Sequence, residues 1–496
     1  MKRMIAIGIA LMLLLNSSMV FAQENRPPEA PDGSMGEAPP EKPNGEPPTG
    51  MTPPDGAPGG GPGGGPGGPS SAPEEYAAVY TINEDMAITE DIVSTGTDEN
   101  AVHVAAGTAE IQGVTVTRSS GDSTGGDAAS FYGVGAAILA TGGSAELSNV
   151  TVTTDANGGA GAFAYGEGIV TLSDSTITTQ KDTSGGIHVA GGGTLYANNV
   201  TVTTQGESSA AIRSDRGGGT MVVSGGSYTS NGVGSPAVYV TADISIQDAA
   251  LAATGSEALC LEGKNNVRLV NCSLSGNMAD LSQNDNTWTV ILYQSMSGDA
   301  EVGEGRFEMD GGALRSQNGG LFYTTNTKSE FVLRQVEISS AADREYFLRC
   351  TGNSNQRGWG QTGANGAQCV FAGICQTMEG DVIWDSISQL SLYATEGSLL
   401  VGAVVDDETH AGNGGDGFCN LYLSQDSTWV VTGDSVLSGL YCAGAIQDGE
   451  GNSVTIVSAD GSVLVSGASP YTVTVHEYST ECDLSGQGTL QNEAME

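Results

Sequence analysis

Residues 145–154 read AELSNVTVTT, residues 170–179 read VTLSDSTITT, and residues 195–204 read LYANNVTVTT. The three stretches superpose without a gap, with Asn149, Asp174 and Asn199 at the same central position. Alternating apolar and polar positions are typical of β-strands, and recurrence at a fixed period of about 25 residues is typical of a solenoid. Each repeat is therefore expected to contribute two short strands joined by a tight turn.

The turn position can be followed along much of the chain. It falls at Gly113, Asn149, Asp174, Asn199, Gly225, Asp248, Asn271, Gly311 and Gln335. The spacing is nearly constant, apart from two longer intervals, which follow Gly113 and Asn271. Gly, Asn and Asp adopt the left-handed conformation of a tight turn at low cost, so these residues are interpreted as structural. A further strand recurs in the same cycle, at residues 136–139, 185–189, 210–213, 236–240 and 257–261.

A single coil of this kind cannot bury its apolar face, whereas stacked coils pair every backbone group with the coils above and below. A leucine-rich repeat would need a Leu-rich consensus and a helical return, and a propeller blade would be longer. The sequence therefore predicts an all-β protein, a right-handed parallel β-helix.

Four segments follow from the composition. Residues 1–22 have the charge, apolar run and Val20-Phe21-Ala22 ending of a signal peptide, with an uncleaved anchor as the alternative. Residues 23–75 form a Pro/Gly-rich linker, either an envelope spacer or a plain tether. The β-helix is expected over 76–345. Residues 346–496, in which strand-like segments recur at longer intervals, read as wider, irregular coils with a cap near 471–477, or as a separate small β domain.

The balance of charged residues limits the classes of partner that the protein is expected to bind. The formal net charge is −41, and the chain has only 17 Lys and Arg. Nucleic acids and anionic membranes are recognised through basic surfaces, so neither is expected as a partner. After residue 22 no stretch is apolar enough to span a membrane, so membrane insertion of the mature chain is not expected either.

Eight cysteines are compatible with disulfides in an exported chain. Cys419 and Cys442 are separated by close to one coil and are the candidates for a disulfide between stacked strands. Pairing of Cys260 with Cys272, or of Cys350 with Cys369 or Cys375, is less well supported. Buried free thiols that fill the stack remain the alternative for all of them.

The two longest intervals mark insertions at 119–135 and 277–306, and insertions in a repeat array project from one face. Aromatic side chains beside amides and carboxylates on such loops suit sugar binding. The candidate ligand-binding residues of the second insertion and the following coil are Trp288, Tyr293, Gln294, Asp299 and Asn326. A lid that covers strands is the alternative.

Arg213, Asp215 and Arg216 form a charged group in a chain with few basic residues. The two arginines are candidates to hold a carboxylate or sulfate, with Asp215 orienting one guanidinium. An ion pair between coils is the structural alternative.

Catalytic patterns are sparse. Asp406, Asp407 and His410 are similar to the paired acids and His of β-helical polygalacturonases, but the basic pair of that family is missing, so no catalytic residue is assigned. No cofactor is expected. Residues 412–418 resemble one turn of a calcium-binding Gly/Asp repeat, which leaves calcium as the one ion to consider.

Several stretches carry a resemblance to a known group: residues 97–102, 208–219, 235–239, 293–301 and 322–327. In these the chain resembles the secreted β-helix, adhesin-like proteins of anaerobic gut Firmicutes. The resemblance extends from the Pro/Gly arm to about residue 400 and implies export and a β-helix, without an agreed biochemical activity.

The first functional hypothesis is a secreted or cell-surface recognition protein that binds a glycan (a polysaccharide or a surface glycan) or a host or neighbouring surface along one face of the β-helix. The second is a polysaccharide lyase or glycoside hydrolase that uses a groove near Arg213, Asp215 and residues 293–301. The third is a structural spacer. A groove shared by Arg213, Asp299 and Asn326 would favour a defined ligand site over a spacer.

Overall fold

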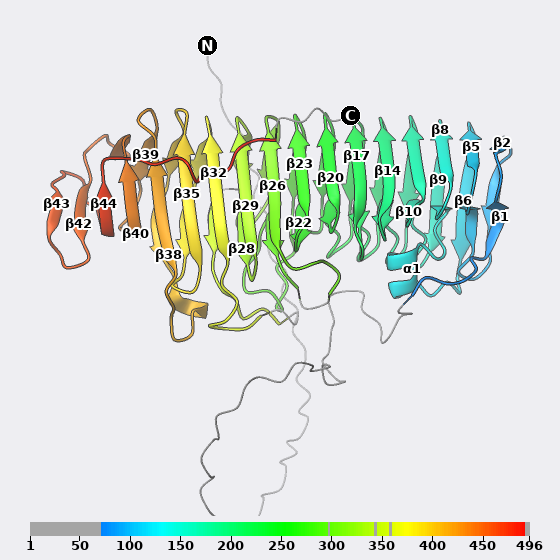
Figure 1. Ribbon diagram of the computed structural model, residues 1–496, viewed down its shortest axis with the longest axis horizontal. Helices are drawn as coiled ribbons and strands as arrows, with labels where there is room; N and C mark the ends of the chain where they lie inside the picture. The colour runs from blue at the N-terminus through cyan, green and yellow to red at the C-terminus, as the bar shows by residue number, and fades with distance from the viewer. Residues whose placement is uncertain (1–70, 296–297, 342–344, 357–359, 492–496) are drawn as a thin grey trace, which may run out of the picture. The chain divides into compact units, whose positions relative to one another are not determined.

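The computed structural model describes residues 71–491, apart from 296–297, 342–344 and 357–359. The expected signal peptide and nearly all of the expected linker lie outside the described residues. In the described part, parallel strands follow one another in coils, and each coil adds one strand to each of three sheets (Figure 1). The predicted parallel β-helix is confirmed.

The sheets are continuous along the solenoid, and the strands of each sheet pair in the following order. Sheet A contains β1 (Ala78–Ile82), β4 (Asn100–Val104), β7 (Ile138–Ala140), β10 (Ala162–Tyr165), β13 (Ile187–Ala190), β16 (Ile212–Ser214), β19 (Val238–Val240), β22 (Leu259–Glu262), β25 (Val290–Tyr293), β28 (Phe322–Thr325), β31 (Leu348–Cys350), β34 (Val382–Trp384) and β37 (Val404–Asp406). Sheet B contains β2 (Met86–Ile88), β5 (Thr108–Gln112), β8 (Ser144–Ser148), β11 (Ile169–Ser173), β14 (Gly193–Asn198), β17 (Gly219–Ser224), β20 (Asp243–Gln247), β23 (Asn266–Val270), β26 (Glu304–Asp310), β29 (Lys328–Arg334), β32 (Gln368–Ile374), β35 (Gln389–Thr395), β38 (Phe418–Leu423), β40 (Ser435–Cys442), β44 (Thr472–Ser479), β42 (Thr455–Ser458) and β43 (Val463–Val465). Sheet C contains β3 (Ile92–Ser94), β6 (Thr115–Ser120), β9 (Thr151–Ala156), β12 (Thr176–Thr179), β15 (Thr201–Thr204), β18 (Ser227–Ser230), β21 (Ala250–Ala253), β24 (Ser273–Gly276), β27 (Ala313–Ser316) and β30 (Glu337–Ser340). Sheet D contains β33 (Thr377–Glu379), β36 (Leu399–Val401), β39 (Thr428–Val431) and β41 (Ala445–Asp448). The described helices are α1 (Gly126–Tyr132) and the short 3-10 helix η1 (Glu408–His410).

The register of the sheets matches the superposition of the sequence repeats. In sheet B, Leu172 pairs with Leu147 on one side and Ala197 on the other. In sheet C, Ile177 pairs in the same way with Val152 and Val202. All of these side chains are buried, so the alternate positions of each strand form the apolar core of the solenoid.

The turn residues adopt the backbone conformation that the repeat implied. Asn149, Asp174 and Asn199 have φ values of 53°, 48° and 53°, and the other six predicted turn positions also have positive φ. Asn199 Nδ2 donates to Asp174 Oδ1 at 2.6 Å, which links neighbouring coils. Cys375 and Glu396 continue the same left-handed turn in later coils, although their residue types gave no such indication.

Phenylalanines fill the core where the coils are longest. The ring of Phe371 lies 5.4 Å from that of Phe322, 5.5 Å from that of Phe331 and 5.3 Å from that of Phe347, measured between centroids. All four side chains have no exposed surface. Edge-to-face aromatic packing therefore supports the coils that carry the long 277–306 and 351–367 segments.

Beyond residue 345 the coils continue, with sheet D following sheet C. Hydrogen bonds between neighbouring coils join residues 21, 29 and 19 positions apart, which is less than the spacing of the strand-like segments suggested. The difference arises mainly at β40, which pairs with β38 only 19 positions further on, whereas β38 follows β35 after 29 positions. The last strands form an end cap in which β44 pairs with both β40 and β42.

The described chain ends in a strap, residues 480–491, which runs back across the outer face of sheet B (the dark red trace in Figure 1). Leu484 and Leu490 pack on an apolar patch that includes Val332 and Tyr393. Gln491 N donates to Glu308 Oε2 at 2.9 Å. The strap therefore covers apolar surface that the solenoid leaves on its outside.

The predicted disulfide between Cys419 and Cys442 is wrong. Both cysteines are free, because the register of β38 and β40 places Leu423 beside Cys442, while Cys419 N bonds to Ser438 Oγ. The two cysteines occupy opposite ends of neighbouring strands. Their separation in the sequence suggested one full coil, but here the coil advances by only 19 positions.

Candidate functional site

Both insertions lie over the outer face of sheet A. In the first, Tyr132 of α1 packs against Tyr165 of sheet A with ring centroids 5.6 Å apart, and both Phe131 and Tyr132 are buried. In the second, Trp288 is 2% exposed and packs against Tyr323 with ring centroids 5.3 Å apart. These aromatic side chains are core residues of a lid, so they do not present free faces on which a sugar ring could stack.

Arg213 and Asp215 belong to a closed ionic cluster under α1. Arg213 Nε lies 2.6 Å from Asp215 Oδ2, and its other nitrogens donate to Ser130 Oγ and to the carbonyl oxygen of Ser208. His188 Nε2 lies 2.8 Å from the same carboxylate oxygen. Because the guanidinium is fully engaged by protein atoms, the predicted ligand-binding role of Arg213 and Asp215 is replaced by a structural one.

Burial decides the protonation of this cluster. It lowers the pKa of His188 to about 4, so the imidazole is neutral at neutral pH. Burial alone would raise the pKa of Asp215, but the charge of Arg213 and the contact with His188 hold it below its ordinary value. The result is a buried Arg–Asp ion pair beside a neutral histidine that stacks on Phe163, with ring centroids 4.0 Å apart.

Arg216 connects the two insertions. Its guanidinium lies 4.2 Å above the ring of Phe131 in α1, and its Nη2 is 2.7 Å from Asp299 Oδ1 in the second insertion. The predicted residues Arg216 and Asp299 are therefore brought together, although 83 positions separate them in the sequence. Together they fasten the described residues 294–295 and 298–303, called here the 294–303 loop, to the face of the solenoid.

A buried carboxyl group anchors the same loop. Glu262 Oε2 accepts hydrogen bonds from Tyr239 at 3.0 Å and Tyr293 at 3.2 Å, and its Oε1 accepts one from Ser295. Burial, together with the nearby charge of Asp299, raises the pKa of Glu262. The hydrogen bonds from the three hydroxyl groups lower this pKa, but they do not outweigh burial. Tyr293 is thus part of a hydrogen-bonded cluster and is not an open aromatic surface.

The other side of the 294–303 loop borders a cleft of about 590 Å³ at the corner between sheets A and B. Polar side chains from three neighbouring coils line it: Lys264, Asn266, Gln294, Glu304, Asn326 and Lys328. Asn326 Nδ2 donates to the carbonyl oxygen of Gln294 at 2.7 Å, so the two predicted residues also touch. This cleft brings together Gln294 and Asn326, but neither Arg213 nor Asp299 lines it, so the expected groove shared by Arg213, Asp299 and Asn326 is not found among the described residues.

The charged groups at the cleft are only weakly paired with opposite charges. Lys264 makes a 3.6 Å ion pair with Glu301, and both side chains are largely exposed, so solvent weakens the pair. Lys328 makes no ion pair with any residue that the structure describes. Gln294 Oε1 is a buried oxygen without a hydrogen-bond partner among the described residues. The ammonium groups of Lys264 and Lys328 therefore remain available along the cleft wall, whereas the Gln294 oxygen is buried.

Sequence reasoning missed Lys328, Asn266 and Glu304 at this cleft, because each stands at an ordinary strand end. An acidic residue at the end of an apolar strand, Leu259–Glu262, was the one signal that could have identified Glu262.

A second polar cluster lies at the last coils of sheet A. The side chain of Asp406 is hydrogen-bonded to that of Glu408, and burial together with this contact raises the pKa of Asp406 to about 6. Burial also raises the pKa of Asp385. Asp407, in contrast, accepts a 2.8 Å bond from Arg349 Nη2, which with the Thr409 hydrogen bonds outweighs burial and lowers its pKa. Neighbouring carboxyl groups here favour different protonation states.

Within the described ranges, no group of three or more His, Cys, Asp or Glu side chains has the arrangement of a metal site. The same residues include no helix that is long and apolar enough to cross a membrane. Comparison with protein-family models, with curated proteins and with solved structures finds no match to this chain.

Proposed function

We propose that the protein is an exported, surface-recognition protein that binds a glycan in the cleft beside the 294–303 loop. The main support for this proposal is that Gln294 and Asn326, from neighbouring coils, line one cleft with Lys264 and Lys328. Its volume of about 590 Å³ is in the range of sites for small ligands. Amide, ammonium and carboxylate groups together offer the donors and acceptors that sugar hydroxyls require.

Two features support recognition over a spacer function. Glu262 holds Ser295 and Arg216 holds Asp299, so the loop beside the cleft is anchored at two points in the absence of a ligand. A rigid wall lowers the entropic cost of binding. The repeat itself needs neither contact to stack its coils.

The test is isothermal titration of the full chain with a panel of neutral and acidic oligosaccharides, with and without calcium. Asn326→Ala and Lys328→Ala should each weaken binding by about five- to thirty-fold, the effect of losing one good polar contact. Arg315→Ala is the matched control, because Arg315 is another exposed cation without an ion pair among the described residues, located on the outer face of sheet C. Equal affinities in all four proteins would refute the assignment of the site.

The protonation pattern of Asp406 and Asp407 favours a second candidate, a glycoside hydrolase. A carboxyl group with its pKa raised to about 6 beside one with its pKa lowered is the kind of pairing that acid–base hydrolysis uses. Release of reducing ends from a polysaccharide, abolished in Asp406→Asn and retained in Asn326→Ala, would establish this candidate. Binding without new ends would leave recognition as the function.

A further inference from the structure

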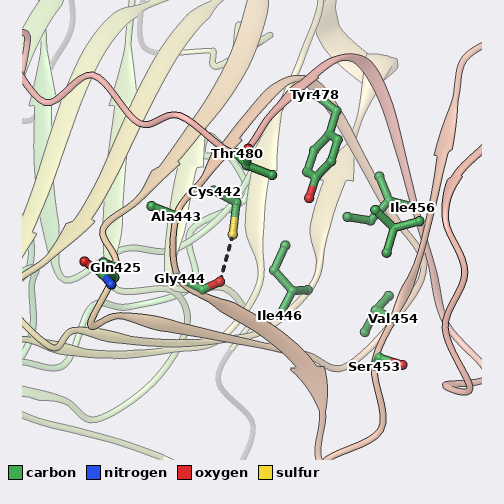
Figure 2. A pocket seen from close by; sticks show the side chains of 11 residues that line it. Gln425, Cys442, Ala443, Gly444, Ile446, Ser453, Val454, Ile456, Tyr478 and Thr480 are labelled. Carbon is green, nitrogen blue, oxygen red and sulfur yellow. Dashed lines mark hydrogen bonds between the residues drawn. The ribbon is translucent and has the colours of Figure 1, made fainter.

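The end of the solenoid contains a cleft that differs in character from the rest of this acidic molecule. Its volume is about 480 Å³, and its walls include Cys442, Ile446, Val454, Ile456, Val465 and Tyr478 (Figure 2). No charged side chain lines it among the described residues, although the chain contains 58 Asp and Glu. The cleft is therefore an uncharged space in which apolar side chains stand beside the neutral polar side chains of Gln425, Ser453 and Thr480.

The cleft arises from a change in strand pairing. β41 is the last strand of sheet D, paired with β39, whereas β42 and β43 join sheet B through β44. Among the described residues, one isolated bridge, between Gln447 of β41 and Ser453, connects the two groups of strands. On one side of this bridge β41 and β42 diverge and leave the cleft between them. Ile446 lies on one wall, and Val454 and Ile456 lie on the other.

Besides Gln425, Ser453 and Thr480, the phenol of Tyr478 lines this space. Figure 2 shows the phenol of Tyr478 extending between Cys442 and Ile456, and its hydroxyl makes no hydrogen bond with a described residue. Burial, with the nearby Cys442, raises the pKa of Tyr478. Burial likewise raises the pKa of the Cys442 thiol to about 11, so both groups stay neutral at neutral pH. A charged ligand would find no counter-ion here, and its desolvation would be unfavourable.

We propose that this end cleft binds a small, neutral and mainly apolar molecule, of aromatic or aliphatic type, with one hydrogen-bonding group that meets the hydroxyl of Tyr478. The side chains of Ile446, Val454 and Ile456 offer apolar surface that a bound apolar molecule would remove from water, which is favourable. A volume of about 480 Å³ suits a ligand of this class. The site is independent of the glycan cleft, which lies at other coils and is lined by charged side chains.

The probe is N-phenylnaphthylamine, a neutral aromatic dye with a single N–H group whose fluorescence rises in apolar surroundings. The full chain should bind one dye molecule in a saturable manner. Ile446→Trp places an indole into the cleft and should abolish binding. Tyr478→Phe should weaken it by about three- to ten-fold, the effect of one neutral hydrogen bond.

Two matched variants act as controls, and circular dichroism establishes that each variant is folded. Leu464→Ser removes a 46% exposed apolar side chain of the cap that does not line the cleft. Tyr441→Phe removes a phenol whose hydroxyl donates to Glu477 on the outer face of sheet B. Both should bind the dye as the parent chain does.

Absence of saturable binding overturns the proposal. So does loss of binding in Leu464→Ser with retention in Ile446→Trp, because that pattern indicates adsorption to the exposed cap surface. Equal affinities in Tyr478→Phe and Tyr441→Phe would overturn the role of the Tyr478 hydroxyl.

Discussion

Replacing His188 by Gln should remove a large part of the acid sensitivity of this protein. The His188 side chain has no exposed surface, and burial lowers its pKa to about 4, compared with 6.5 for a free histidine. Below pH 6.5 the imidazole of His188 binds a proton in the unfolded chain but stays neutral in the folded chain. The free energy of unfolding therefore falls as the pH drops toward 4. One pKa unit corresponds to about 1.4 kcal/mol. Between about pH 7.5 and pH 5 the parent chain should therefore lose about 2 kcal/mol through this residue alone.

The assay is urea unfolding, followed by tryptophan fluorescence at both pH values, for the parent chain, His188→Gln and His476→Gln. Carboxyl groups with raised pKa, such as Asp406, titrate in the same window with the opposite sign, but they do so in all three proteins. The difference between parent and variant therefore isolates His188. The loss in His188→Gln should be about 2 kcal/mol smaller than in the parent, and the exposed His476→Gln should follow the parent. An equal loss in all three proteins would refute the reasoning that His188 is buried and neutral.

Three further outcomes follow from the geometry. Arg216→Ala should change the free energy of unfolding by less than about 1 kcal/mol, because its ion pair with Asp299 is partly exposed; titration should nevertheless show weaker glycan binding, since the 294–303 loop loses a fastening. Phe371→Ala should lower the free energy of unfolding by about 3–5 kcal/mol, measured in urea, through the cavity it leaves among four packed rings; a loss below about 1 kcal/mol would contradict that packing. Asn199→Val should cost about 1–3 kcal/mol because a β-branched residue is strained at φ 53°, whereas Asn199→Gly should cost less; thermal melts of the two variants that coincide would rule out strain at this turn.

The fold could be predicted to the level of individual strands because its physical cause is local. The alternation around Ile177 and the left-handed turns at Asn149 and Asp174 are properties of a few adjacent residues, repeated until the register has one solution. The lengths of the irregular coils could not be predicted in this way. The shortened coil that parts Cys419 from Cys442 depends on how far each turn extends before the next strand pairs, and no short pattern records that.

The candidate sites divide in the same way. The sequence by itself determined that residues 277–306 interrupt the repeat and that basic residues are scarce. It could not decide that Arg213 turns inward to Asp215 while Arg216 reaches Asp299, because two neighbouring side chains meet partners 2 and 83 positions away. Only the tertiary structure decided which polar groups are consumed in holding the loops and which, such as Lys328 and Asn326, line an open cleft. The physical reason is that local preferences set the backbone of each coil, whereas burial and pairing across the stack are set by neighbours that lie far away in the chain.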